Sequence, residues 1–167
     1  MEKKLIIFGT GEIAEIAFYY FSNFSEYNVS FFTVDDKFIK EENFCGKPVV
    51  PFQKIEEIYD PKSYDMHVAI SYQKMNKTRA EKYNEAKLKG FQLSNFISKK
   101  SNIHENVIFG DNCFVLENQT IQQNVKLGSN IMIWSSNHIG HGTIMNNHTY
   151  LSSHVIISGH CEIGLRC

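Results

Sequence analysis

The hydrophobic positions in the C-terminal part of the chain follow a strict period of six. Every sixth residue there is large and apolar, in one unbroken series: Ile103, Phe109, Val115, Ile121, Leu127, Ile133, Ile139, Met145, Leu151, Ile157 and Ile163. A helix of 3.6 residues per turn cannot keep such a period on one face, and a single strand alternates with a period of two. A coil of three short strands can, because the first residue of each hexad then points inward. We therefore predict a parallel β-helix of hexapeptide repeats over residues 100–167.

The fourth position of the hexads supports this architecture independently. It is held mostly by Asn, Gly and His, in the series Asn106, Asn112, Asn118, Asn124, Asn130, Ser136, Gly142, His148, His154 and His160. These residue types accept a positive φ angle most readily, and a coil needs such an angle wherever one flat strand turns into the next. We therefore expect corners at this position, which gives a purely structural explanation for His148, His154 and His160.

The N-terminal part has a different pattern, in which short apolar runs alternate with turns and helical stretches. The runs that we expect to be strands are Leu5–Phe8, Val29–Thr33 and Met66–Ser71. An amphipathic helix follows the first run, and a charged helical stretch, Asn76–Lys89, ends at Gly90. Because strands that alternate with helices form a parallel sheet, residues 1–99 are expected to be a small Rossmann-like α/β domain.

Two segments of this domain are candidates for binding a nucleotide. The first strand leads into a Gly-x-Gly-x-x-Ala turn, whose glycines allow a phosphate to approach backbone N–H groups at a helix N-terminus. Carboxylates and a lysine follow the second strand, at the same strand ends where open α/β sheets bind ligands. The candidate residues are Gly9, Thr10, Gly11, Asp35, Asp36 and Lys37. The alternatives are a turn that only closes the strand, and carboxylates that are merely solvated.

Composition and charge narrow the classes of function. The chain has 17 basic and 18 acidic residues and a formal net charge of -1, so it lacks the basic field that nucleic acids or anionic lipids require. The apolar run Leu5–Phe8 is too short for a secretory signal or a membrane span, so we expect a cytoplasmic protein. The four cysteines form no CxxC pair, which indicates free thiols and no bound metal.

Together these segments resemble the bacterial nucleotide-sugar acetyltransferases of the sialic acid O-acetyltransferase type. The motifs that carry the resemblance are Ile6-Ile7-Phe8-Gly9-Thr10-Gly11, Val34-Asp35-Asp36-Lys37, Gly46-Lys47-Pro48-Val49, Val68-Ala69-Ile70, Asn137-His138-Ile139-Gly140-His141-Gly142 and Ser152-Ser153-His154-Val155. The resemblance implies a nucleotide-binding domain joined to a left-handed β-helix, assembled as a homotrimer. It also implies acetyl transfer from acetyl-CoA, without a metal, to an amino or hydroxyl group of a UDP- or dTDP-linked deoxysugar, as in surface-glycan biosynthesis.

The candidate catalytic residues lie in the repeats. His141 occupies the third position of its hexad, where the corner explanation does not apply, between Gly140 and Gly142. The resemblance makes it the general base that deprotonates the sugar nucleophile for direct attack on the thioester. Gly159 lies one coil of 18 residues later and should stack on His141, so its N–H could stabilise the oxyanion, as a matching glycine does in the related enzymes. Asn137 and His138 are weaker candidates, for orienting the sugar or polarising His141.

Two other functions are compatible with the same residues. One is a chain that binds a nucleotide sugar and forms trimers without catalysis. The other is a zinc-dependent hydratase of the carbonic anhydrase type, which also uses a left-handed β-helix but needs three imidazoles at an open site. Related chains continue through further coils that help to bind coenzyme A, whereas this sequence ends at Cys167, so we expect a fragment or a truncated form.

Overall fold

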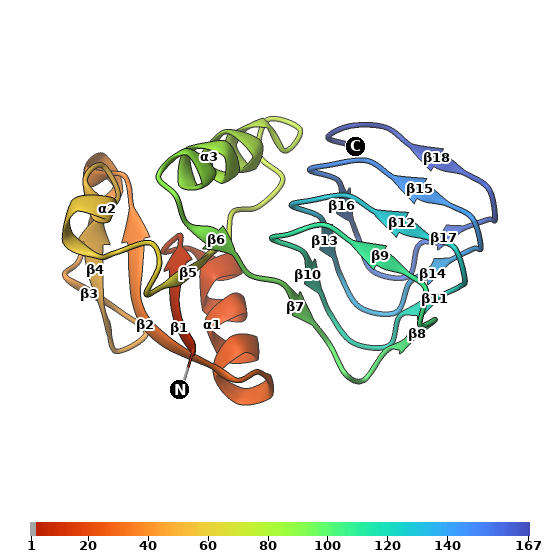
Figure 1. Ribbon diagram of the computed structural model, residues 1–167, viewed down its shortest axis with the longest axis horizontal. Helices are drawn as coiled ribbons and strands as arrows, with labels where there is room; N and C mark the ends of the chain where they lie inside the picture. Colours follow the sequence, from red (N-terminus) through yellow and green to blue (C-terminus); the bar gives the residue numbers. More distant parts are fainter. Residues whose placement is uncertain (1–2) are drawn as a thin grey trace. The chain divides into compact units, whose positions relative to one another are not determined.

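The computed structural model describes residues 3–167, which form two compact units (Figure 1). The first unit comprises residues 3–71 and 81–94, and the second comprises residues 72–80 and 95–167. Helix α3 (Lys77–Leu88) therefore begins in the second unit and ends in the first. The predicted domain boundary at residue 100 stays a prediction, and each unit is described by itself.

The first unit is built around a six-stranded sheet in the order β3-β4-β2-β1-β5-β6. Its strands are β1 (Lys3–Phe8), β2 (Tyr27–Val34), β3 (Asn43–Phe44), β4 (Lys47–Pro51), β5 (Asp65–Val68) and β6 (Gln92–Leu93). The helices are α1 (Glu12–Phe24), a 3-10 turn η1 (Asp36–Phe38), α2 (Ile55–Ile58) and the later part of α3. Neighbouring strands are parallel except for β3 and β4. The central strand β1 reads as a continuous apolar run because both faces of a parallel sheet are covered, and Leu5, Ile6 and Ile7 are fully buried.

Strands are present at all three predicted places in this unit, although β5 ends at Val68 and not at Ser71. The sheet also has members that the pattern did not indicate. The unpredicted strand β4 pairs with β2 from Val49 to Pro51 and with β3 through Lys47 and Pro48. Proline donates no hydrogen bond to a ladder, and for this reason such a segment does not read as a strand. Gly90 ends α3 with a φ angle of 90°, as expected for a helix C-cap.

In residues 95–167 the strands form three sheets of four short parallel strands each (Figure 1). The first sheet holds β7 (Phe96–Ile97), β10 (Phe114–Val115), β13 (Met132–Ile133) and β16 (Tyr150–Leu151). The second holds β8 (Asn102–Ile103), β11 (Thr120–Ile121), β14 (His138–Ile139) and β17 (Ile156–Ile157). The third holds β9 (Ile108–Phe109), β12 (Lys126–Leu127), β15 (Ile144–Met145) and β18 (Glu162–Ile163). Each strand pairs with the strand 18 residues later, as Val115 does with Ile133, and such stacks fit the expected left-handed β-helix.

The residues of the six-residue series line the interior of these coils. All eleven belong to one hydrophobic cluster, in which Ile133 and Ile139 are fully buried. The members at the two ends of the series, Ile103, Phe109 and Ile163, are only partly buried. The prediction that the first position of each hexad points inward is therefore confirmed.

The predicted corners are confirmed with one exception and one addition. The fourth-position residues from Asn112 to His160 all have positive φ angles, between 53° and 67°. Arg166 continues the series with a φ angle of 59°. Asn106 has no positive φ angle and lies in an ordinary turn, where its side chain contacts His104 and donates to Asn124.

A ladder of corner side chains connects successive coils. Asn112 Nδ2 donates to Asn130 Oδ1 at 2.8 Å, and Asn130 Nδ2 lies 2.8 Å from His148 Nδ1. Because an amide nitrogen only donates, His148 Nδ1 is the acceptor and its imidazole is neutral. Burial, followed by the nearby positive charge of Arg79, lowers the pKa of His148 below its ordinary value of 6.5.

We expect His148 to make the free energy of unfolding depend on pH. Since its folded-state pKa is lowered, its stabilising contribution is complete above pH 6.5 and is lost as the pH falls towards the folded-state pKa. His148→Asn would keep both the corner and the ladder without a titrating group. Its free energy of unfolding should therefore fall less than that of the wild type between about pH 7.5 and about pH 5.5. Urea unfolding at both pH values measures this, with His154→Asn at an exposed corner as the control. An unchanged pH dependence in His148→Asn contradicts the assignment.

Arg79, in the first turn of α3, is buried within the second unit. Its Nη2 atom donates to the carbonyl oxygens of His148 at 3.0 Å and Thr149 at 3.1 Å, and lies 3.4 Å from that of Asn130. Burial lowers its pKa to about 10. The guanidinium thus fixes the segment 72–80 to the corner of the coils, although a charged helical stretch is ordinarily solvated.

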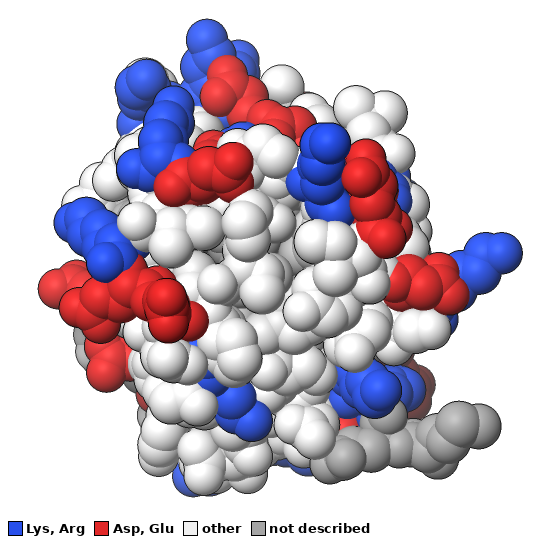
Figure 2. All heavy atoms as spheres, turned by 90° about the vertical axis from the view of Figure 1, so that its left-hand side faces the viewer, with Lys and Arg blue, Asp and Glu red and all other residues white. Residues whose placement is uncertain are grey.

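No helix within residues 3–167 has the length and apolar character needed to cross a bilayer. Figure 2 shows one face of the molecule, on which basic and acidic side chains are interspersed around an uncharged area.

Candidate functional site

The His141 side chain is exposed and lies against the backbone of the next coil. It follows β14 directly, in the tight segment between Gly140 and Gly142. A Cβ atom on Gly159 would lie only 2.6 Å from Cε1 and 2.9 Å from Nδ1 and Nε2 of the His141 ring. The two residues are therefore stacked, as the 18-residue spacing predicts, and the imidazole occupies the space that any side chain at position 159 would need.

Gln122 holds His141 from the preceding coil. Its Oε1 atom accepts a hydrogen bond from the His141 backbone N–H at 2.9 Å and lies 3.1 Å from Nδ1 of the ring. No sequence motif indicated this residue, since it lies 19 positions before His141 and outside both hexad series.

The backbone N–H of Gly159 has no hydrogen-bond acceptor within residues 3–167. The matching N–H of His141 is bonded by the side chain of Gln122, and the residue equivalent to Gln122 one coil later is Gly140. A Cβ atom on Gly140 would lie 2.6 Å from the Ser158 carbonyl carbon and 2.9 Å from Gly159 Cα, so the coil spacing excludes a side chain there. One N–H group is thus left available beside the His141 ring.

His160, the residue after Gly159, also contacts the His141 ring. The ring centroids of His141 and His160 are 4.9 Å apart, and the two planes are nearly perpendicular at 89°. Gly142 makes room for this contact, because a Cβ atom there would lie 2.7 Å from His160 Nδ1. His160 is thus both a corner residue with a φ angle of 56° and a neighbour of His141.

The weaker candidates Asn137 and His138 have different surroundings. Asn137 is buried at 2% exposure, where its amide donates to Trp134 O and accepts from Val155 N at 2.7 Å. These bonds join neighbouring parts of the coils and occupy both ends of the amide. His138 lies half-buried on β14, level with Thr120 on one side and Ile156 on the other. A role of either residue in orienting a sugar stays a prediction.

The arrangement around His141 suits acyl transfer without a covalent enzyme intermediate. An exposed imidazole can act as a general base, and an unpaired backbone N–H beside it can donate to a developing oxyanion. The buried thiol of Cys113 is no nucleophile, since burial raises its pKa to about 12 and its Sγ atom donates to Gly128 O. Within residues 3–167, no group of three or more His, Cys, Asp or Glu side chains could hold a metal ion.

In the first unit, the glycine turn has the geometry expected after a central strand. Gly9 has a φ angle of 131°, and its N–H donates to Thr33 O of the neighbouring strand β2 at 2.9 Å. A Cβ atom on Gly9 would lie 2.7 Å from Ala69 O, so only glycine fits. Gly11 caps α1 and has open space where a side chain would be. Thr10 lines a small cavity of about 220 Å³ beyond the turn.

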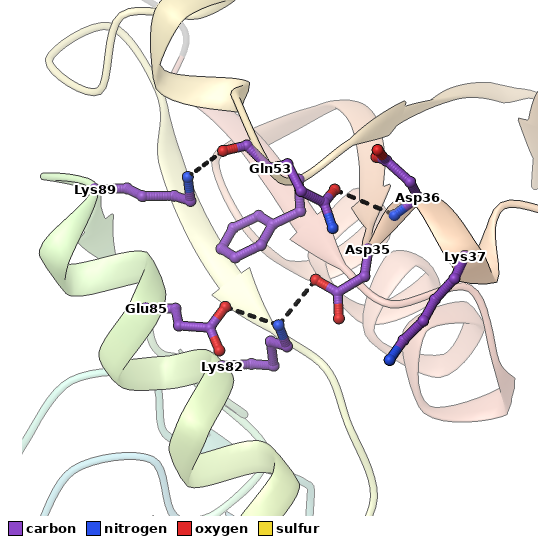
Figure 3. Close-up of a pocket in the computed structure, with 8 residues that line it drawn as sticks. Asp35, Asp36, Lys37, Gln53, Lys82, Glu85 and Lys89 are labelled. Carbon is purple, nitrogen blue, oxygen red and sulfur yellow. Dashed lines mark hydrogen bonds and ion pairs between the residues drawn. The ribbon is translucent and has the colours of Figure 1, made fainter.

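A larger cavity of about 470 Å³ lies beside the end of β2 (Figure 3). Its lining combines one aromatic ring with basic and acidic side chains: Asp35, Asp36, Lys37, Phe52, Gln53, Lys82, Glu85 and Lys89. Asp35, Asp36 and Lys37 all line this cavity, whereas the glycine turn does not, and a nucleotide site formed by both segments stays a prediction. The other five residues were not predicted, because they come from the segment after β4, from within α3 and from the residue that follows α3.

Ion pairs fix several charged groups of this cavity (Figure 3). Lys82 Nζ lies 2.8 Å from Asp35 Oδ1 and 2.7 Å from Glu85 Oε2, and both Lys82 and Asp35 are largely buried. Burial lowers the pKa of Lys82, but the hydrogen bonds to Asp35 and Glu85 outweigh it and raise that pKa overall. Lys89 is held by Gln53 O at 2.7 Å and by the Glu56 carboxylate. A cavity of this size, with a ring, carboxylates and ammonium groups, suits a ligand that has both a planar ring and anionic groups.

Comparison with known proteins identifies solved structures of the same fold. No protein-family model matches this sequence, and no curated protein sequence matches it. The acetyltransferase domain of PglB from Neisseria gonorrhoeae FA1090, in complex with acetyl coenzyme A, is similar with 17% identity and a TM-score of 0.74. The match covers 90% of this chain and 70% of that one.

Two further structures are similar over nearly the whole chain. PerB from Caulobacter crescentus, in complex with CoA and GDP-perosamine, has 16% identity and a TM-score of 0.71 over 99% of this chain and 94% of PerB. WeeI from Acinetobacter baumannii AYE has 16% identity and a TM-score of 0.63 over 96% of this chain and 74% of that one. At these identities the likeness shows a shared fold.

Proposed function

We propose that this chain is an acyltransferase that moves the acetyl group of acetyl-CoA to an amino or hydroxyl group of a nucleotide-linked deoxysugar. The observation that carries the proposal is the exposed His141 imidazole stacked on Gly159, whose N–H is unpaired within residues 3–167. On this proposal, the base and the oxyanion donor lie on successive coils. The fold likeness supports the proposal, since PglB was solved with acetyl coenzyme A and PerB with CoA and GDP-perosamine.

The reaction follows from these two groups. Nε2 of His141 accepts a proton from the sugar nucleophile as the latter attacks the thioester carbonyl carbon. The carbonyl oxygen becomes an oxyanion, which the Gly159 N–H stabilises. Collapse of the tetrahedral intermediate breaks the carbon–sulfur bond, and the proton held by His141 goes to the coenzyme A thiolate. No acyl-enzyme forms, and the products are the acetylated sugar and free coenzyme A.

The first unit, as a Rossmann-like domain, would bind the nucleotide. We place the phosphates at Gly9, Thr10 and Gly11, and the base or ribose at the cavity of Asp35, Asp36 and Lys37. The parallel sheet supports this, because both segments follow the carboxyl ends of the adjacent strands β1 and β2. UDP and dTDP are the nucleotides that the family resemblance implies, and GDP is added because PerB was solved in complex with GDP-perosamine.

The assembly that we propose is a cytoplasmic homotrimer. Outward-facing isoleucines support it, since Ile108, Ile144 and Ile156 are 58%, 40% and 79% exposed on two faces of the coils. Apolar side chains on flat β-helix faces are buried most simply by symmetric association. Light scattering coupled to size-exclusion chromatography measures the mass of the assembly.

The experiment that tests the proposal is a coenzyme A release assay. The purified chain is mixed with acetyl-CoA and a panel of UDP-, dTDP- and GDP-linked amino and hydroxy sugars, and free thiol is followed over time. Thiol release that requires one of the sugars, with an acetylated sugar detected by mass spectrometry, supports the proposal. Binding of a nucleotide sugar without any thiol release would instead identify a non-catalytic binding protein.

Asp35→Asn should weaken nucleotide-sugar binding by roughly 10- to 100-fold, because a hydrogen bond to a charged group contributes about 1.5–3 kcal/mol. Isothermal titration with the sugar identified in the assay measures the Kd. Glu57→Gln makes the same carboxylate-to-amide change on α2, outside the cavity lining, and should leave the Kd unchanged. An unchanged Kd in Asp35→Asn would remove this residue from the proposed site.

A further inference from the structure

Gln122 is the side chain that contacts both the backbone and the ring of His141. It follows β11 and belongs to the coil before His141. Its Oε1 atom contacts two nitrogen atoms of His141, the backbone N at 2.9 Å and ring Nδ1 at 3.1 Å. One amide oxygen thus lies between two groups of the same residue.

The contact with the His141 backbone N–H shows which atom of the Gln122 amide faces His141. A backbone N–H can only donate, so the amide atom that faces it must be the oxygen and not the NH₂ group. The same oxygen faces Nδ1, and an amide oxygen can only accept a hydrogen bond. Nδ1 must therefore carry a proton.

The other neighbours of the ring do not compete for that proton. Gly159 contributes only backbone against the ring, and His160, the titratable group in contact, meets it perpendicularly at a centroid distance of 4.9 Å. Neither residue makes a hydrogen bond to Nε2 in the described part of the chain. In the neutral ring, the proton on Nδ1 leaves the Nε2 lone pair free.

We propose that Gln122 is a positioning residue, which fixes the Nδ1–H tautomer of His141 and so presents Nε2 as the base. This inference rests on the function proposed above. Because the amide is neutral and does not titrate, it holds the tautomer at any pH at which the ring is neutral, without adding charge to the site.

The tautomer can be measured without any substrate. Long-range ¹H–¹⁵N correlation spectra of the ¹⁵N-histidine-labelled chain distinguish Nδ1–H from Nε2–H, and the signals missing in His141→Ala assign the ring. The wild-type chain should show Nδ1–H. Gln122→Met keeps a similar side-chain length without an acceptor and should lose this preference, whereas Gln122→Glu keeps an acceptor and should retain it.

Activity provides the second measurement. Gln122→Met should lower kcat by roughly tenfold, a fraction of the 10²–10⁴ that a general base supplies, with little change in KM for the sugar. Gln122→Glu should recover most of this loss. Gln123→Met makes the same change at the next residue, whose side chain is exposed, and should match the wild type in both measurements.

Each outcome decides one point. A wild-type ring with its proton on Nε2, or a Gln122→Met ring that keeps the Nδ1 proton, overturns the assignment. If Gln122→Met loses the Nδ1–H tautomer of His141 but keeps the wild-type kcat, Gln122 has no positioning role in the reaction. If the wild-type chain acetylates no sugar, the proposed function fails, but the spectra still decide whether Gln122 sets the tautomer. Thermal unfolding of each variant shows whether the fold is kept.

Discussion

Replacing His141 by alanine should lower kcat for acetyl transfer by roughly 10²–10⁴, the usual contribution of a general base. The reason is that the nucleophile would lose the imidazole that is stacked on Gly159. Because the side chain is exposed and outside the hydrophobic cluster, the melting temperature and the Kd for the nucleotide sugar should change little. The coenzyme A release assay, thermal unfolding and titration measure these three quantities.

His104→Ala is the matched control for this variant. His104 is another exposed histidine of the coils, and its ring contacts only Asn106 among the hydrogen bonds of the described chain. Its kcat should equal that of the wild type. If His141→Ala retains more than about a tenth of the wild-type kcat, a base contribution of this size is excluded and His141 is not the base.

Gly159→Ala should reduce kcat by about 10² or more without unfolding the protein. A Cβ atom at this position would lie 2.6 to 2.9 Å from three atoms of the His141 ring, well inside van der Waals contact. The backbone can accept alanine, since Gly159 has no positive φ angle. The exposed ring must therefore move, which separates the base from the oxyanion donor. A shift of about 1 Å in such a pair can cost about 10² in rate.

Gly164→Ala tests whether this effect is specific. Gly164 belongs to the last coil, lacks a positive φ angle and has no atom within 4 Å of its Cβ position. Both variants should melt within a few degrees of the wild type, and only Gly159→Ala should lose activity. Full activity in Gly159→Ala would mean that the stacked arrangement is irrelevant to the reaction.

The repeats could be predicted from the sequence because their rule is local and periodic. Each inward residue, such as Ile133, is fixed by a spacing of six, and each corner, such as Asn130, by the backbone angle that it must adopt. Asn106 fits the spacing but lacks the positive φ angle, so the spacing alone does not determine every corner.

The side chains that complete the sites could not be predicted, because their positions depend on contacts distant in the sequence. Lys82 meets Asp35 across 47 positions, and Arg79 reaches the carbonyl of Thr149 across 70. Nothing in the local pattern of α3 separates these two cations from its solvated lysines. Gln122 was missed for a related reason: its partner is a backbone N–H, which leaves no signature in the sequence.

The 18-residue stacking of His141 on Gly159 restricts how a protein with this site can change its length. If one residue were deleted between them, His160 would take the place of Gly159 against the imidazole, and one insertion would put Ser158 there. An excursion that leaves and rejoins a corner, or a change of length outside residues 141–159, keeps Gly159 in that place. Descendants of such a chain can therefore lengthen freely at corners, while the flat segments between His141 and Gly159 keep a constant count of residues.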